Sequence, residues 1–101
     1  MKRRVELHNV LVKILGSNNV YFQPPANVRM KYPAIVYTRN DMDNQHADNI
    51  PYIQKMGYQI VYISKDPDDP VVQKIADLPY CRYDRHYNSD NLNHDVFSIY
   101  F

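Results

Sequence analysis

Apolar residues recur with a helical period near the start of the chain and with a strand period in much of the rest. Between Val5 and Leu15 the apolar side chains follow the i, i+3, i+4, i+7, i+8 spacing of a helix that packs one face on a core. The residues with this spacing are Leu7, Val10, Leu11, Ile14 and Leu15. Gly16, followed by a run of turn-forming residues, predicts that this helix ends there.

Three segments in the middle of the chain have the composition or the alternation of β-strands. The first is short because two prolines follow it, and proline lacks the N–H that a strand ladder needs. The second is apolar at both parities, which predicts burial on both faces, and the third is the longest and is expected to be central. The predicted strands are Val20–Gln23, Ala34–Arg39 and Ile53–Ser64.

A short second helix is predicted after the sequence KDPDDP. Asp69 is expected as its N-cap and Pro70 at its first position, because an aspartate accepts the free N–H groups and proline lacks one. A buried stripe is then expected from Val71, Ile75 and Leu78, and Pro79 ends the helix.

The last part of the chain predicts an antiparallel hairpin formed by residues 80–87 and 95–101 across the turn region NSDNLNH. Strand parity predicts five inward side chains: Tyr83, Tyr87, Phe97, Ile99 and Phe101. The order helix, three strands, helix, two strands predicts one α+β domain over residues 1–101. We expect an antiparallel or mixed sheet of four to five strands, with both helices packed on one face.

Composition narrows the function mainly by exclusion. Twelve Lys and Arg against eleven Asp and Glu give a net charge of +1, so no global field draws the protein to nucleic acid or an anionic membrane. The two glycines are far apart, which excludes a glycine-rich phosphate loop. A single cysteine, no secretory signal and no apolar run of ~20 residues lead us to expect a reducing cytoplasm and no membrane.

The polar segment between residues 40 and 51 has acidic residues at alternate positions, as the start of a calcium-binding loop does. The glycine needed at the sixth position is replaced by His46, and the bidentate carboxylate needed at the twelfth is replaced by Tyr52. We therefore expect no metal here and interpret the segment as a loop that contacts a partner. Its candidate contact residues are Asp41, Asp43, His46 and Asp48.

Catalytic signatures are not found in the sequence. No two histidines lie at the i, i+4 spacing that places both on one metal ion, and no serine lies in a nucleophile elbow. Cys81 is expected to be a buried, unreactive thiol that shares a strand face with Tyr83 and Tyr87. The sequence therefore predicts a protein that is not an enzyme and that has no catalytic residues, metal or cofactor.

Tyrosines and arginines alternate in the segment YCRYDRHY. Tyrosine has an apolar ring with a polar end, and both residue types are common at interface centres. The pattern fits ion pairs of Arg82 and Arg85 with Asp84, Asp90 or a neighbouring subunit, and it also fits a stacking platform for single-stranded nucleic acid. A net charge near zero favours the first interpretation. The predicted interface residues are Tyr52, Tyr80, Arg82, Arg85 and Tyr100.

The order of several motifs resembles that of tail completion proteins of tailed bacteriophages, also described as tail terminator or head-tail joining proteins. The similarity runs from Glu6 to Phe101 and is carried by FQPP, YPAIVY and LNHDVF, together with a helix ending in LG, the turn KDPDDP and the segment LPYC.

The resemblance implies a structural virion protein that forms a hexameric ring on the tail tube and joins the tail to the head connector protein. It implies assembly in the host bacterial cytoplasm, with DNA passing through the ring without specific binding. The acidic loop would then suit a wall along which DNA moves, because like charges prevent adhesion. The alternatives are a small phage-encoded nucleic-acid-binding module or a regulatory module that binds another protein.

Overall fold

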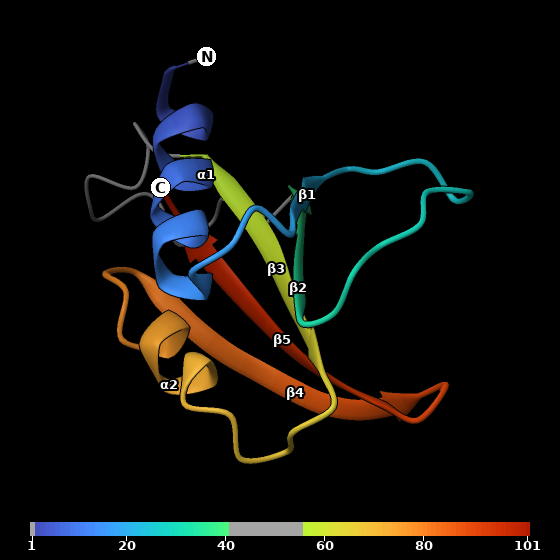
Figure 1. Cartoon of the computed structure of the whole chain (residues 1–101). Coiled ribbons are helices and arrows are strands. Elements are labelled where there is room, and N and C mark those ends of the chain that lie inside the picture. Colours follow the sequence, from blue (N-terminus) through green and yellow to red (C-terminus); the bar gives the residue numbers. More distant parts are fainter. Residues whose placement is uncertain (1, 41–55) are drawn as a thin grey trace.

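The computed structural model describes residues 2–40 and 56–101, which form a five-stranded mixed sheet with two helices on one face (Figure 1). The predicted α+β class is confirmed. In chain order the elements are α1 (Lys2–Leu15), β1 (Val20–Phe22), β2 (Ala34–Arg39), β3 (Gly57–Ser64), α2 (Val71–Ala76), β4 (Cys81–Ser89) and β5 (Leu92–Tyr100). None of the described helices is long and apolar enough to cross a membrane.

The amphipathic stripe of α1 packs against the sheet as predicted. Leu7 and Leu11 are fully buried, and Ile14 and Leu15 pack beside them. Gly16 ends the helix with φ of 80°, a backbone conformation that glycine adopts without a Cβ penalty, and its N–H donates to the carbonyl of Val12 at 2.8 Å. The expected position of this helix and its end are confirmed.

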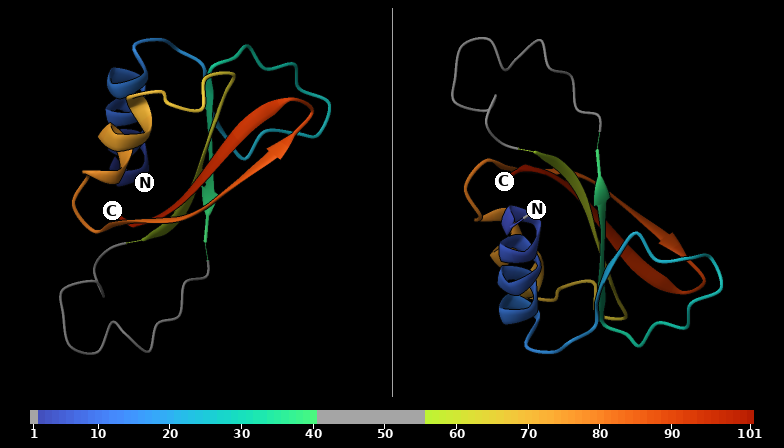
Figure 2. Two further views of the ribbon diagram at one scale, coloured as in Figure 1. Left: turned by 90° about the horizontal axis from the view of Figure 1, so that it is seen from below. Right: turned by 90° about the horizontal axis from the view of Figure 1, so that it is seen from above.

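The strand order is β1-β2-β3-β5-β4, with β1 parallel to β2 and every other pair antiparallel. β3 is therefore central, as its length and composition predicted. Its side chains Tyr58, Ile60 and Tyr62 are fully buried or nearly so, and they contact the helices' core residues. Figure 2 shows α1 and α2 together on this side of the sheet.

The second helix begins one residue later than expected. Its N-cap is Pro70, so the prediction of Asp69 in that position is wrong. The Asp69 carboxylate nevertheless satisfies the first free donor, because its Oδ1 accepts the Val71 N–H at 2.9 Å. Its other oxygen accepts the hydroxyl of Tyr62, and this bond fixes the start of α2 to the sheet. Ile75 is fully buried, while Val71 and Leu78 are half-buried beside the core.

The β4–β5 hairpin turns through only two residues, Asp90 and Asn91, at φ of 55° and 63°. These are the positive angles of a type I′ turn, which matches the twist of the flanking strands. Phe97 and Ile99 are fully buried and Phe101 is half-buried, as predicted.

Tyr83 faces the helix side of the sheet as predicted, but it is 44% exposed rather than buried. The inward placement predicted for Tyr87 is wrong, because it lies on the opposite face and is 40% exposed. β4 is an edge strand, and the six residues of α2 contact only part of it. Alternation along a strand assigns faces, but it does not say how far the covering helix extends. An irregularity in β4, described below, also separates the two tyrosines onto different faces.

Candidate protein interface on the helix-free face

The face of the sheet opposite α1 and α2, here called the helix-free face, is built from rows of residues that pair across the strands. One row joins Tyr21, Val36, Val61, Val96 and Arg85 across all five strands. Neighbouring rows end on β4 at Arg82 and Tyr87. The segment between β1 and β2 lies on this side (Figure 2), and the Lys31 N–H donates to the Tyr21 hydroxyl at 3.4 Å.

A β-bulge places both arginines of β4 on this face. Arg82 pairs with Ser98 and Arg85 pairs with Val96, and these partners lie two residues apart in β5. Residues two apart in a strand share a face, whereas Arg82 and Arg85, three apart, would face opposite sides in a regular strand. Asp84 is the extra residue of the bulge and has no partner in the β5 ladder. Arg85 is therefore shifted by one position and faces the same side as Arg82.

Asp84 holds Arg82 in place. Its Oδ1 accepts from Arg82 Nε at 2.8 Å, and its Oδ2 accepts the hydroxyl of Ser98, which is 5% exposed. The ion pair uses Nε, so within the described part of the chain the Nη groups of Arg82 remain for a partner, and the side chain is 76% exposed. An ion pair in such an exposed position contributes little stability, about 0–1 kcal/mol, so its main effect is on the position of the guanidinium.

Arg85 is held by an aromatic pair rather than by a carboxylate. Its guanidinium carbon lies 5.7 Å from the ring centre of Tyr87, and that ring stacks on His94 at 4.7 Å and 15°. Among residues 2–40 and 56–101, Arg85 makes no ion pair. We call Arg82, Asp84, Arg85, Tyr87 and His94 the arginine patch.

The predicted interface residues fall into three groups. Arg82, Arg85 and Tyr100 share the helix-free face on adjacent strands, Tyr100 being opposite Gly57. Tyr80 lies just before β4, with φ of 58° and 48% exposure. The remaining candidates, Asp41, Asp43, His46, Asp48 and Tyr52, lie outside the described residues.

Tyr83 is on the other face, so it does not form a platform with the arginines. Its ring meets Phe97 edge to face at 5.3 Å, and its hydroxyl donates to Asp95 Oδ1 at 2.9 Å. Desolvation and the adjacent carboxylate raise the pKa of Tyr83. Within YCRYDRHY, Tyr83 therefore faces the helix side, whereas Arg82, Arg85 and Tyr87 lie on the helix-free face.

Cys81 lies beside the core at the start of β4 and is half-buried. Burial, reinforced by the charge of Asp84, raises the pKa of its thiol to about 11. Its predicted shared face with Tyr83 is confirmed, but Tyr87 is on the opposite face because of the bulge. Within the described part of the chain, no group of three or more His, Cys, Asp or Glu residues is placed to hold a metal ion.

Sequence reasoning found the two arginines and weighed Asp84 as an ion-pair partner, which the Arg82–Asp84 pair bears out, but it missed the bulge and the Tyr87–His94 stack. Nothing in the spacing identified Asp84 as an inserted residue or paired it with Ser98. The only available signal was that Arg82 and Arg85 have opposite parity in a segment that otherwise reads as one strand. Comparison with protein-family models, curated proteins and solved structures found no match to this chain.

Proposed function

We propose that this chain is a structural, non-enzymatic subunit of a tailed-phage virion. In this role it assembles into a hexameric ring that caps the tail tube and joins it to the head connector. The motifs FQPP, YPAIVY and LNHDVF supply the resemblance on which the virion assignment rests. The structural observation that supports a role in assembly is the arginine patch.

The arginine patch has the properties of a contact surface. Arg and Tyr are enriched at the centres of protein interfaces, where they combine apolar area with directed hydrogen bonds. Here the two guanidinium groups are already positioned by Asp84 and by the Tyr87–His94 stack. A side chain fixed before binding loses less conformational entropy when the partner arrives. Val36 and Val61, half-buried in the same row, continue this face across the sheet, whereas Val96 beside Arg85 is buried.

The edges of the sheet are poorly suited to pairing with another strand. β4 carries a bulge and three charged residues, and β1 has only three residues and is followed by two prolines. Charges, bulges, prolines and short edge strands are the features by which proteins prevent edge-to-edge association. We therefore propose that neighbouring subunits meet through side chains on faces and turns.

The test is whether the chain stops tube growth. Tail tube protein from the same phage is polymerised with and without the purified chain, and tube lengths and ends are examined by negative-stain electron microscopy. We expect shorter tubes with a ring at one end, and light scattering should give the mass of a hexamer for the ring. Tubes of the same length and appearance in both samples would show that the chain is not a terminator.

The nucleic-acid-binding alternative has one observation in its favour, the position of Arg85 over Tyr87. It predicts that the chain binds a labelled single-stranded oligonucleotide with an affinity that falls steeply as salt increases. Replacing Arg85 should then weaken binding, while tube growth should be unaffected by the chain.

A further inference from the structure

A second charged surface connects β3 to α2. Residues 66–69, here called the acidic turn, contain three aspartates, and Lys65 precedes them. Asp66 and Asp68 are exposed, whereas Asp69 is half-buried. The carboxylate of Asp68 makes no hydrogen bond or ion pair with any residue in the described ranges. This turn therefore presents negative charge that no ion pair within residues 2–40 and 56–101 neutralises.

The acidic turn is held in one conformation by hydrogen bonds along its length. The Ser64 hydroxyl donates to the carbonyl of Asp66 at 3.0 Å, and Asp66 Oδ1 accepts the Asp68 N–H at 2.9 Å. At its other end the Asp69 carboxylate accepts the Tyr62 hydroxyl and the Val71 N–H. Both charged surfaces are thus positioned before any partner binds, which lowers the entropy cost of an encounter.

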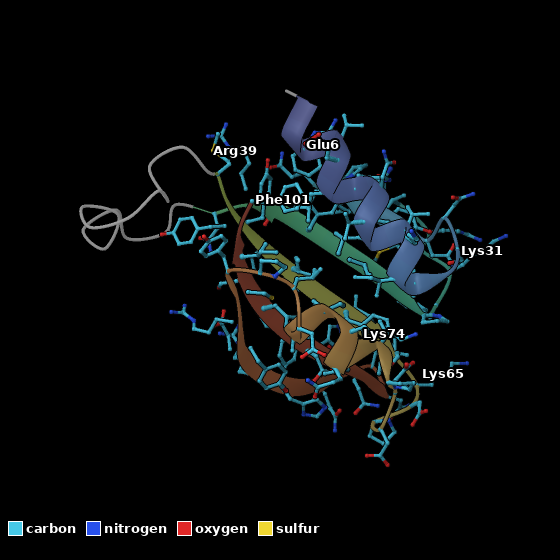
Figure 3. The ribbon with its side chains drawn as sticks, turned by 90° about the vertical axis from the view of Figure 1, so that its left-hand side faces the viewer. Glu6, Lys31, Arg39, Lys65, Lys74 and Phe101 are labelled. Carbon is cyan, nitrogen blue, oxygen red and sulfur yellow. The ribbon has the colours of Figure 1, made fainter. Side chains whose placement is uncertain are left out.

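The two surfaces lie on opposite sides of the sheet. Tyr62, which anchors the acidic turn, belongs to the core beneath the helices, and the turn leads directly into α2. Figure 3 looks onto the helices and shows Lys65, next to the turn, near Lys74 of α2. Arg82 and Arg85 are on the helix-free face. The body of the sheet therefore separates the arginine patch from the acidic turn of the same chain.

We infer that the arginine patch of one copy binds the acidic turn of a second copy of this chain. The Nη groups of Arg82 and the guanidinium of Arg85 would donate to the carboxylates of Asp66 and Asp68. Hydrogen bonds between two charged groups are shorter and stronger than neutral ones. This inference rests on the proposed function, because it identifies a contact by which ring subunits would join.

The opposite placement determines the kind of assembly. Each copy carries both members of the contact, and the two members are unlike surfaces. A contact between unlike surfaces is heterologous, so it leaves a free patch at one end of a pair and a free turn at the other. Such a contact continues until a ring closes or a filament grows, whereas a contact between like surfaces would stop at a dimer.

A second copy is favoured over nucleic acid because of the charges around the patch. Asp84 lies between the two arginines and would repel a phosphate backbone, and the net charge of the chain is only +1. A short acidic turn needs only the few donors that the patch offers. The complementary charge is present on this same chain.

The experiment reverses one charge on each surface in the full-length chain. Arg85→Glu makes the patch acidic, and Asp68→Lys reduces the charge of the turn from −3 to −1 and places a cation where Asp68 faced the patch. Lys31→Glu is the matched control, since it makes the same charge change as Arg85→Glu at an exposed residue outside both surfaces. Circular dichroism and thermal melts establish that each variant folds. Self-association is measured by sedimentation velocity at low and high salt, and tube capping is measured with the same samples.

We expect Arg85→Glu and Asp68→Lys each to weaken self-association roughly tenfold or more, because like charges would then face each other or the attraction would be lost. Lys31→Glu should behave as the original chain. Mixing the two interface variants should restore association, since the intact patch of Asp68→Lys can bind the intact turn of Arg85→Glu. Association of the original chain should weaken with salt.

Three results would overturn the inference in distinguishable ways. If the original chain forms rings or caps tubes and both reversals leave this unchanged, the contact is wrong and the proposed function stands. If the original chain neither self-associates nor caps tubes, the proposed function fails and the contact fails with it. If the original chain binds single-stranded DNA in low salt and Arg85→Glu does not, while neither reversal alters self-association, the patch binds nucleic acid instead.

Discussion

Removing the Tyr83 hydroxyl tests whether this partly exposed tyrosine stabilises the fold through its hydrogen bond to Asp95. Tyr83 is 44% exposed, yet its hydroxyl donates to Asp95, a carboxylate that is only 6% exposed. Tyr83→Phe keeps the edge-to-face contact with Phe97 and removes only the donor. The carboxylate of Asp95 would then lose a hydrogen bond in a position that water reaches poorly.

The expected cost follows from the burial of the acceptor. A hydrogen bond to a charged group contributes about 1.5–3 kcal/mol, and the exposure of Tyr83 allows some water to replace it. We therefore expect a loss of about 1–2 kcal/mol in the free energy of unfolding. In a domain of this size that loss lowers the Tm by roughly 5–10 °C. Urea unfolding followed by circular dichroism measures the first quantity, and thermal melts measure the second.

Tyr87→Phe is the control, because it makes the same chemical change in the same strand at similar exposure, 40%. Its hydroxyl makes no hydrogen bond to a described residue, and its ring contacts would be retained. A surface change of this kind should stay within about 0.5 kcal/mol. Equal effects of the two substitutions, whether both large or both negligible, would refute the assignment of Tyr83 as a support for Asp95.

Three further changes test other parts of the structure. Burial, with a contribution from Arg4, lowers the pKa of His8 below its ordinary 6.5, so the folded chain favours the neutral ring, whose Nδ1 is hydrogen-bonded with the Tyr37 hydroxyl at 2.8 Å. The contribution of His8 to the free energy of unfolding should be fully present above pH 6.5 and should be lost as the pH falls below it. In His8→Gln this part of the pH dependence of the urea midpoint should disappear. A thiol pKa of about 11 at Cys81, against an ordinary 9.0, predicts alkylation by iodoacetamide about 100-fold slower near neutral pH in the folded chain than in urea, and equal rates would contradict it. Gly16→Ala should cost about 1 kcal/mol in urea unfolding from backbone strain alone, because no atom lies within 4 Å of the added Cβ; an unchanged midpoint would argue against the positive φ.

The elements that the sequence predicted well are those with strong periodicity and clear ends. The stripe containing Leu7 and Leu11 located α1, and Gly16 marked its end. Ala34–Arg39 was predicted with its observed bounds because a proline precedes a segment rich in β-branched and aromatic residues. The alternation of Tyr58, Ile60 and Tyr62 identified the core face of β3. In each case the local pattern and the tertiary burial favour the same structure.

The errors occurred where tertiary structure decides. Burial of Tyr83 depends on how far α2 covers the edge strand, and the spacing of residues in β4 does not indicate that distance. Tyr87 is exposed for a different reason, because the bulge places it on the helix-free face. The parallel pairing of β1 with β2 makes the sheet mixed, one of the two arrangements that the sequence allowed, and it depends on the path of the segment between these strands. For the interface, composition identified Arg82 and Arg85, but their common face depends on a bulge that strict alternation cannot express.

Asp84 lies outside the strand ladder, yet it affects how the arginine patch is arranged. Without Asp84, Arg82 would pair with Ser98 and Arg85 with Val96 in a regular ladder, and the two-residue turn at Asp90 would be unchanged. The common face of the arginines therefore does not require the aspartate; it requires only that the aspartate be excluded from the ladder. What Asp84 adds is a carboxylate that binds Arg82 and Ser98 on that face. A strand that carried the arginines alone would present two cations with more rotamer freedom. The bulged strand instead holds Arg82 at Nε, and its Nη groups have no partner among residues 2–40 and 56–101.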